Sequence, residues 1–134
     1  MLEERIYSKL ISMIEEFTNS QSDVKGQILI SFPSGVPVAD TWNEKIDPIL
    51  VGALSAAVKL TFRKLCKSFK KGNLKRLLMR SEYGRVIIQD TGPNAILTTI
   101  VDDEADIFGV AFSTNNLVIS IRNYLKDTQL KFKV

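Results

Sequence analysis

Nine lysines and arginines fall between Pro48 and Ser81 with no acidic residue among them, and these side chains are the best candidates for binding chemistry. The rest of the chain carries nine basic and fifteen acidic residues, so the formal net charge of +3 divides into +9 and −6. Such segregation favours an anionic partner near the basic segment, whether protein, lipid or nucleic acid. The residues that we expect to contact this partner are Arg63, Lys64, Lys67, Lys70, Lys71, Lys75 and Arg76.

Catalytic chemistry has few candidate residues. The chain has no histidine and one cysteine, Cys66, which argues against a Cys–His nucleophile pair, zinc or haem ligation and an internal disulfide. We interpret Cys66 as a small buried apolar side chain. No glycine-rich loop ending in lysine is present to bind nucleotide phosphates, so the chain is not itself a GTPase. The sequence therefore predicts a non-enzymatic protein without catalytic residues, metal or cofactor.

Four acids lie close together at Asp102, Asp103, Glu104 and Asp106. They lack the spacing and the glycine of an EF-hand loop. Acidic side chains are favourable at the N-terminus of a helix, where the unpaired N–H groups and the helix dipole attract negative charge. We therefore interpret this cluster as the start of a helix and not as a metal or acid–base site.

The elements that position the basic segment follow from hydrophobic spacing. Apolar residues at three- and four-residue steps predict a helix over 2–18. Two apolar runs, Ile28–Phe32 and Val36–Thr41, flank Pro33-Ser34-Gly35, in which Pro presets φ and Gly supplies a positive φ, so they predict a β-hairpin. Asp47 and Pro48 then begin a second helix that extends to Phe69.

The second half of the chain predicts three strands and a last helix. The strands are Leu74–Glu82, Arg85–Asp90 and Ala95–Val101, and an apolar stripe from Ile107 predicts a helix ending near Lys126. The order α-β-β-α-β-β-β-α indicates an α+β fold with a five-stranded antiparallel sheet. We expect one domain over residues 1–134, a cytoplasmic location, and a frayed tail over 129–134.

The second helix carries unusually short side chains, which allow another backbone to approach closely. Its longer apolar residues occupy more than one face, which favours burial on two sides. We expect this helix and the exposed strand that follows to pack in a dimer. The alternative is that the short side chains let the helix pack tightly on its own sheet. The interface residues are predicted to be Gly52, Ala53, Ala56, Ala57 and Leu60 on the helix, with Leu74, Leu77, Leu78 and Met79 on the strand.

The order of elements, the hairpin at 28–39 and the small-residue helix resemble the roadblock / dynein light chain family, with its profilin- and longin-like sandwich. The likeness covers almost the entire chain, although Pro33-Ser34 stands where the family has an acidic or polar residue before the turn glycine. The resemblance implies a homodimer, or a heterodimer with a paralogue, in which third strands pair antiparallel and second helices lie side by side. It also implies a platform that binds or regulates a small Ras-like GTPase, or an adaptor in signalling assemblies.

An alternative is a charge-driven binder of an anionic membrane surface or of nucleic acid through the basic region at 59–80. Nucleic acid is disfavoured because the basic segment lacks aromatic residues spaced for base stacking, apart from Phe62 and Phe69, which helical spacing assigns to packing. Contact with lipid headgroups requires charge alone and stays open. We expect Trp42 to pack at the core or at its edge.

Overall fold

The computed structural model describes residues 2–42, 45–92 and 94–127. Helices and strands follow one another in the predicted order. They are α1 (Leu2–Ser20), β1 (Val24–Ser31), β2 (Pro37–Asp40), α2 (Pro48–Ser68), β3 (Arg76–Ser81), β4 (Gly84–Gly92), β5 (Ala95–Val101) and α3 (Ile107–Asp127). The predicted α+β class and the five-stranded antiparallel sheet are both confirmed.

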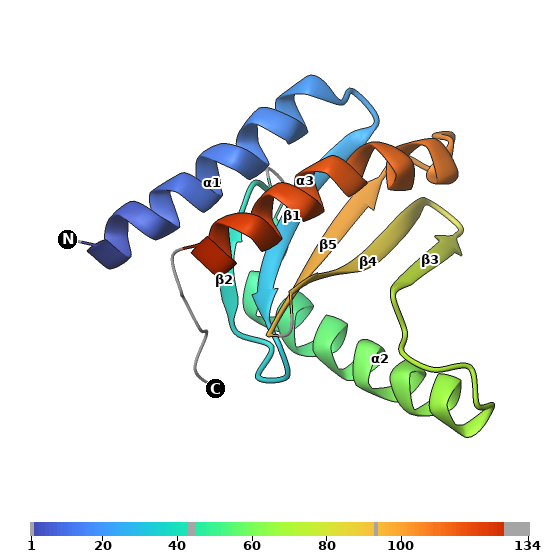
Figure 1. Ribbon diagram of the computed structural model, residues 1–134. Helices are drawn as coiled ribbons and strands as arrows, with labels where there is room; N and C mark the ends of the chain where they lie inside the picture. Colours follow the sequence, from blue (N-terminus) through green and yellow to red (C-terminus); the bar gives the residue numbers. More distant parts are fainter. Residues whose placement is uncertain (1, 43–44, 93, 128–134) are drawn as a thin grey trace.

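The strands lie in the order β2-β1-β5-β4-β3, so β2 and β3 form the two edges of the sheet. β1 pairs with the last strand, β5, over nearly its whole length, from Val24 opposite Val101 to Ser31 opposite Ala95. β3, β4 and β5 follow as a meander. This order places the loop that leaves α2 beside an open edge of the sheet (Figure 1).

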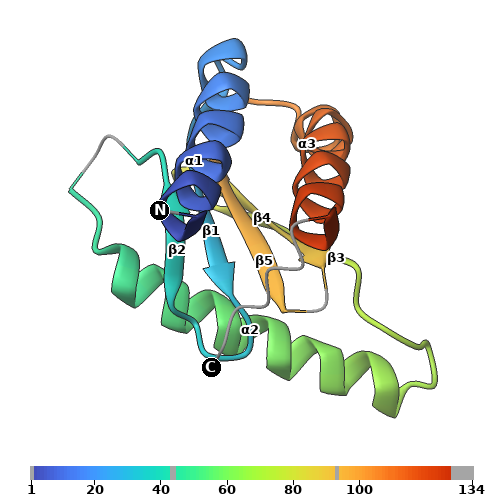
Figure 2. The same ribbon diagram turned by 60° about the vertical axis from the view of Figure 1, so that its left-hand side comes forward.

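The helices divide unequally between the two faces of the sheet. α1 and α3 lie side by side on one face, and α2 crosses the other face alone (Figures 1 and 2). Ile6, Leu10 and Ile14 follow the helical spacing of α1 and are buried against the sheet and α3. Ile121 and Leu125 of α3 complete the same cluster, so the core on this face is closed within the chain.

The sequence features predicted for the hairpin and the start of α2 are present. Asp47 caps α2, because its carboxylate accepts a hydrogen bond from the Ile49 N–H at 3.0 Å, and Pro48 occupies the first turn. Gly35 has a φ of +81°, which favours glycine. A side chain at Gly52 would meet the Gly35 carbonyl oxygen, since an added Cβ would lie 2.2 Å from it. The hairpin turn and α2 are therefore in direct backbone contact.

Several predicted boundaries were wrong by a few residues. β1 begins at Val24 and not at Ile28, because Gln27 is fully buried and donates a hydrogen bond from Nε2 to Thr99 Oγ1 at 3.0 Å. A buried polar residue of this kind breaks the apolar pattern that marks a strand. β2 and β3 are shorter than predicted, β4 is longer, and α1 extends to Ser20.

Trp42 packs at the sheet, as expected, with its ring against Gly26 of β1, where a Cβ would meet Trp42 Cε3 at 2.4 Å. The tail at 129–134 lies outside the described residues. Within the described residues, none of the helices combines the length and apolar character needed to cross a bilayer.

Candidate partner-binding surfaces

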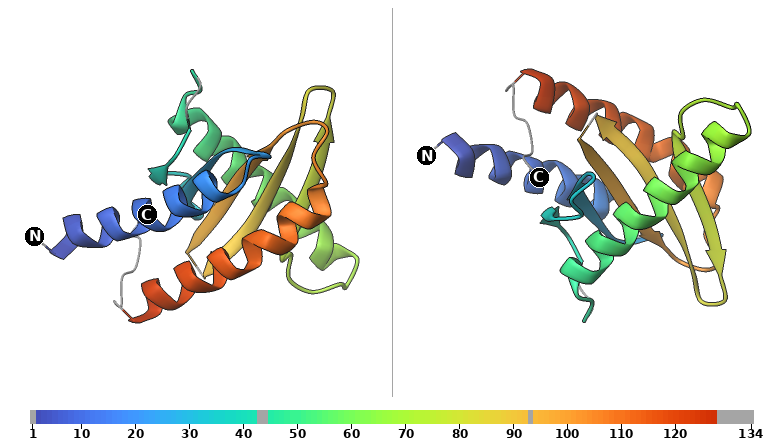
Figure 3. Two further views of the ribbon diagram at one scale, coloured as in Figure 1. Left: turned by 90° about the horizontal axis from the view of Figure 1, so that it is seen from above. Right: turned by 90° about the horizontal axis from the view of Figure 1, so that it is seen from below.

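The face of the sheet beneath α2 is only partly covered. α2 packs on β1 and β2, where Ala56 meets Ile28, Ile30 and Phe32. Figure 3 (right) shows α2 crossing this face of the sheet. Away from the contact with β1 and β2, toward the β3 edge, Leu77, Met79 and Val86 stay half-buried. Apolar side chains therefore remain accessible along one margin of the α2 face, which is the arrangement expected where a further element packs.

α2 itself presents an apolar stripe to solvent. Leu50 and Leu54 are each 56% exposed and Leu65 is 44% exposed, although all three lie on a well-formed helix. Ala53 and Ala57 are exposed beside them. The spacing of these residues places them on the side of α2 that faces away from its own sheet.

Two of the predicted interface residues on this helix do not reach that stripe. Gly52 and Ala56 are buried within the chain, Gly52 against the hairpin turn and Ala56 against the sheet. Their small size serves the packing of α2 on its own sheet. Ala53 and Ala57 are exposed and Leu60 is half-buried, so these three stay accessible to a second helix.

Among the strands that the structure describes, β3 is an edge strand with only β4 beside it. Its side chains alternate between the two faces. Leu77 and Met79 lie on the α2 side, whereas Leu78 packs with the core beneath α3. Leu74, predicted as part of this strand, precedes it and is half-buried. The outer backbone N–H and C=O groups of β3 are therefore available for strand pairing.

The predicted basic residues fall into two groups. Lys64, Lys67, Lys70 and Lys71 are exposed on the last turns of α2 and the loop that follows. Arg63 is half-buried, with its guanidinium carbon 5.3 Å from the centre of the Phe32 ring. These five positions form one positive end of the α2 face.

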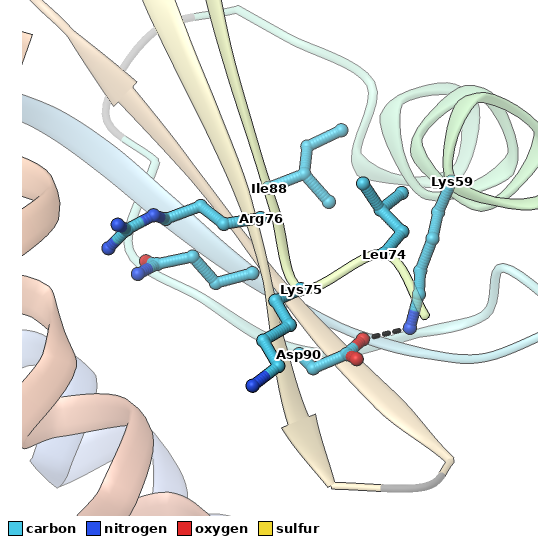
Figure 4. Close-up of a pocket in the computed structure, with 7 residues that line it drawn as sticks. Lys59, Leu74, Lys75, Arg76, Ile88 and Asp90 are labelled. Atoms are coloured by element: carbon cyan, nitrogen blue, oxygen red, sulfur yellow. Dashed lines mark hydrogen bonds and ion pairs between the residues drawn. The ribbon is translucent and has the colours of Figure 1, made fainter. Parts of the chain in front are cut away.

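Arg76 belongs to a different surface. Figure 4 shows Leu74 and Ile88 directed toward α2, whereas Arg76 is directed the opposite way. Its Nη1 lies 3.4 Å from Asn115 Oδ1 on α3. Lys75, which precedes β3, is exposed between the two surfaces, since it lines both the small pocket beneath α2 and the groove beside α3. Spacing along the sequence could not separate Arg76 from the α2 group, because β3 reverses the direction of side chains at each residue.

Lys59 is a basic residue that is not solvated. Its side chain is 8% exposed and pairs with Asp90 beneath α2, and its ammonium lies 4.3 Å from the centre of the Phe32 ring (Figure 4). Burial and the nearby Arg63 cation lower the pKa of Lys59 to about 8, while the Asp90 carboxylate favours the charged form. Lys59 fixes α2 to the sheet and is not available to a partner.

The acidic cluster behaves in part as predicted. Asp106 caps α3, accepting a hydrogen bond from the Phe108 N–H at 3.2 Å. Asp102 forms an ion pair with Lys25 at 3.1 Å. Among the described residues, no group of three or more cysteine, aspartate or glutamate side chains is arranged to hold a metal ion. The interpretation of Cys66 as a small buried side chain was wrong, since it is half-buried and lines a groove.

Solved structures share this fold. MglB from Myxococcus xanthus superposes with a TM-score of 0.83 at 13% sequence identity, over 96% of this chain and 95% of that chain. The gliding protein MglB from Thermus thermophilus gives 0.80 at 17% identity, over 91% and 92%. A Roadblock/LC7 domain from Streptomyces avermitilis gives 0.79 at 16% identity, over 87% and 97%.

The sequence itself matches no family model, and its comparison with curated proteins gives no match. At identities of this size, structural likeness shows the fold alone. The chain has the roadblock fold, as the resemblance in its order of elements indicated.

Proposed function

Since the chain has the roadblock fold, we propose that it is a dimeric, non-enzymatic platform that binds or regulates a small Ras-like GTPase. One observation carries the dimer: the exposed stripe of Leu50, Leu54 and Leu65 lies on the same side of the sheet as the open margin of β3. A second copy covers both features at once when β3 pairs with β3 and α2 packs beside α2. We take residues 1–134 as one domain in this assembly.

The interface that we propose is smaller than the sequence alone indicated. It keeps Ala53, Ala57 and Leu60 on α2, adds the exposed leucines there, and uses Leu77 and Met79 on β3. Gly52 and Ala56 leave the interface because they are buried within the chain, and Leu78 leaves it because it packs beneath α3. Leu74 stays at its margin. The partner copy is this chain or a paralogue with the same apolar stripe.

The GTPase partner is inferred from the roadblock resemblance, and the charge of the α2 face supports it. Lys64, Lys67, Lys70 and Lys71 lie exposed at one end of that face, with Arg63 next to them. A dimer with a two-fold axis presents two such ends. Positive charge of this kind speeds association with an acidic protein surface and weakens as salt increases.

The oligomeric state tests the dimer directly. We expect light scattering after size exclusion to give a mass of twice 15.0 kDa for the wild type, in moderate and in high salt. Leu54→Glu should give a folded monomer, because it places a charge in the apolar stripe. Ile119→Glu is the matched control, since Ile119 is 48% exposed on α3, and it should stay dimeric. A monomeric wild type contradicts a homodimer.

Binding to a small GTPase needs a separate test. Purified Ras-like GTPases from the source genome, loaded with GDP or with a non-hydrolysable GTP analogue, are titrated against the wild type. We expect binding that depends on the nucleotide and that weakens in the Lys67→Ala/Lys70→Ala/Lys71→Ala variant at low salt. Binding to anionic vesicles that is indifferent to any GTPase, and lost in the same variant, favours the membrane alternative.

A further inference from the structure

A groove opens at the start of β3, between α3 and the segment that joins α2 to β3. It encloses about 790 Å³ and is lined by Cys66 near the end of α2, Leu74, Lys75 and Arg76 before and in β3, Gln89 in β4, and Asn115, Val118 and Arg122 in α3. The proposed dimer interface meets it only at its margin, at Leu74. Pairing at the β3 edge engages backbone groups in the plane of the sheet and leaves this face open.

The charge of the groove is positive. Arg76 Nη1 contacts Asn115 Oδ1 at 3.4 Å, and Arg122 Nη2 contacts the Asp90 carbonyl oxygen at 3.3 Å. Each contact uses one N–H of a guanidinium that carries five. The carboxylate of Asp90 does not neutralise them, because it pairs with Lys59 on the other face (Figure 4). Arg76, Arg122 and Lys75 therefore present N–H donors to a ligand that binds in the groove.

An apolar stripe continues from this groove along α3. Phe108 is 72% exposed, Phe112 is 77% exposed and Ile119 is 48% exposed. With Asn115 and Arg122 they recur at steps of four, three, four and three residues, which places all five on one flank of the helix. This spacing is that of a helix that packs along a second helix.

We propose that this flank of α3 and the groove together bind an acidic amphipathic helix of a partner protein. Its apolar side chains cover Phe108, Phe112 and Ile119, and its carboxylates pair with Arg76 and Arg122. Charge complementarity selects this occupant, because guanidinium groups bind carboxylates through parallel N–H donors, whereas a basic helix is repelled at the same end. Arg76, Arg122 and the α3 flank lie on the side of the sheet away from α2, so this surface adds a second partner to the platform.

The test uses a fluorescein-labelled peptide of about twenty-one residues with leucine at heptad positions a and d, glutamate at e and g, and alanine elsewhere, so that it can form a helix in isolation. Fluorescence anisotropy in low and in moderate salt reports its affinity. We expect the wild type to bind it, and the Arg76→Gln/Arg122→Gln variant to bind about tenfold more weakly. Phe112→Ser should weaken binding in either salt, because its contribution is apolar.

Two controls keep the result specific. Lys64→Gln/Lys67→Gln removes the same charge from the α2 face and should leave the affinity within about twofold. A twin peptide with lysine in place of glutamate should not bind. The proposal is overturned if the wild type ignores the acidic peptide, if the two double variants lose affinity equally, or if the lysine twin binds as well. Binding of the protein to anionic vesicles that depends on Arg76 and Arg122, with no binding of the acidic peptide, also overturns the proposal.

The same variants separate this proposal from the dimeric platform. Arg76→Gln/Arg122→Gln should keep the dimer mass, and Leu54→Glu should keep peptide binding, because the residues concerned lie on opposite faces. Loss of the dimer in Leu54→Glu with intact peptide binding supports both the dimeric platform and the peptide-binding groove. Peptide binding by a wild type that is monomeric supports the groove and contradicts the platform.

Discussion

The two faces of the sheet differ in how completely helices bury their apolar side chains. On one face, α1 and α3 pack against each other and against the strands, and Leu10, Ile14, Leu97 and Ile121 reach zero exposure. On the other face, α2 is the single covering helix within residues 2–42, 45–92 and 94–127, and it leaves Leu77, Met79 and Val86 half-buried. The core side chains of the first face are therefore fully buried by helices of the same chain. On the second face some apolar side chains stay partly exposed, which is the property expected of an assembly surface.

Polar contacts follow the same division. Thr114 Oγ1 donates to Gln89 Oε1 at 2.7 Å and fixes α3 to β4, while Thr98 Oγ1 donates to Ser55 Oγ at 3.0 Å and fixes α2 to β5. The α2 face adds the Lys59–Asp90 ion pair to this. Polar groups thus help to set the register of α2 on the sheet, because hydrogen bonds and ion pairs are directional where apolar contacts are not.

The largest expected effect is on the face that α1 and α3 cover. Ile121→Ala removes a fully buried side chain between α1, α3 and the sheet, so we expect the free energy of unfolding to fall by about 3 kcal/mol. Leu54→Ala, on the α2 stripe, should change it by less than about 0.5 kcal/mol at protein concentrations where the chain is monomeric. Urea denaturation measures both. Equal losses would mean that Leu54 is buried within the monomer.

The second prediction concerns the buried side of α2. Gly52→Val places a branched side chain against the Gly35 carbonyl oxygen, where a Cβ alone lies 2.2 Å away. Since that oxygen belongs to the backbone, it cannot simply move aside, and we expect a loss of about 2 to 3 kcal/mol. Ala53→Val, on the next residue and exposed, should cost about 0.5 kcal/mol through helix propensity. A tolerated Gly52→Val would show that the hairpin turn and α2 separate readily.

These residues also show what could be predicted from the sequence. The periodicity of Ile6, Leu10 and Ile14 was sufficient for α1, and Asp47-Pro48 was sufficient for the start of α2, because both signals are local. Gly52 and Ala53 are both small and adjacent, yet one faces the hairpin and the other faces solvent. That choice depends on the angle at which α2 crosses the sheet, which involves residues far apart in the chain.

The groove beside α3 could not be predicted for a related reason. Arg76 stood in a run of basic residues, and Arg122 lay among the ordinary charges of an amphipathic helix. Only the pairing of β3 with β4 and the packing of α3 on β4 bring the two arginines to the same groove. The exposed Phe108 and Phe112 were the one sequence signal, since they fall outside the apolar stripe that α3 buries.

The third prediction compares the polar contacts that fix each helix. Thr114→Val leaves the Gln89 oxygen without its donor, and Ser55→Ala leaves the Thr98 hydroxyl without its acceptor, both at buried positions. We expect each to lower the free energy of unfolding by about 1 kcal/mol. Thr61→Val, whose hydroxyl is exposed on α2, should cost no more than about 0.5 kcal/mol. A much smaller loss for Ser55→Ala would mean that α2 holds its register by apolar packing alone.

The smallest expected effect is the pH dependence of the Lys59 contact. The pKa of Lys59 is about 8 in the folded chain against 10.5 for an unperturbed lysine, so between these values the unfolded chain binds more protons. The wild type should therefore gain stability as the pH rises from 8 toward 10.5, and it should lose this gain as the pH falls through 8. Lys59→Met removes the titrating group and should lack this gain.

The difference in unfolding free energy between the wild type and Lys59→Met, measured in urea at about pH 7, 8, 9 and 10, isolates this group from the other lysines and tyrosines. At the lowest pH we expect Lys59→Met to be less stable than the wild type by roughly 1 to 2 kcal/mol, because it leaves the partly exposed Asp90 carboxylate without its ion-pair partner. The difference should then move in favour of the wild type at each higher pH. Movement in the opposite direction would mean that Asp90 raises the Lys59 pKa more than burial and Arg63 lower it, and that the contact beneath α2 is held by charge across the whole range.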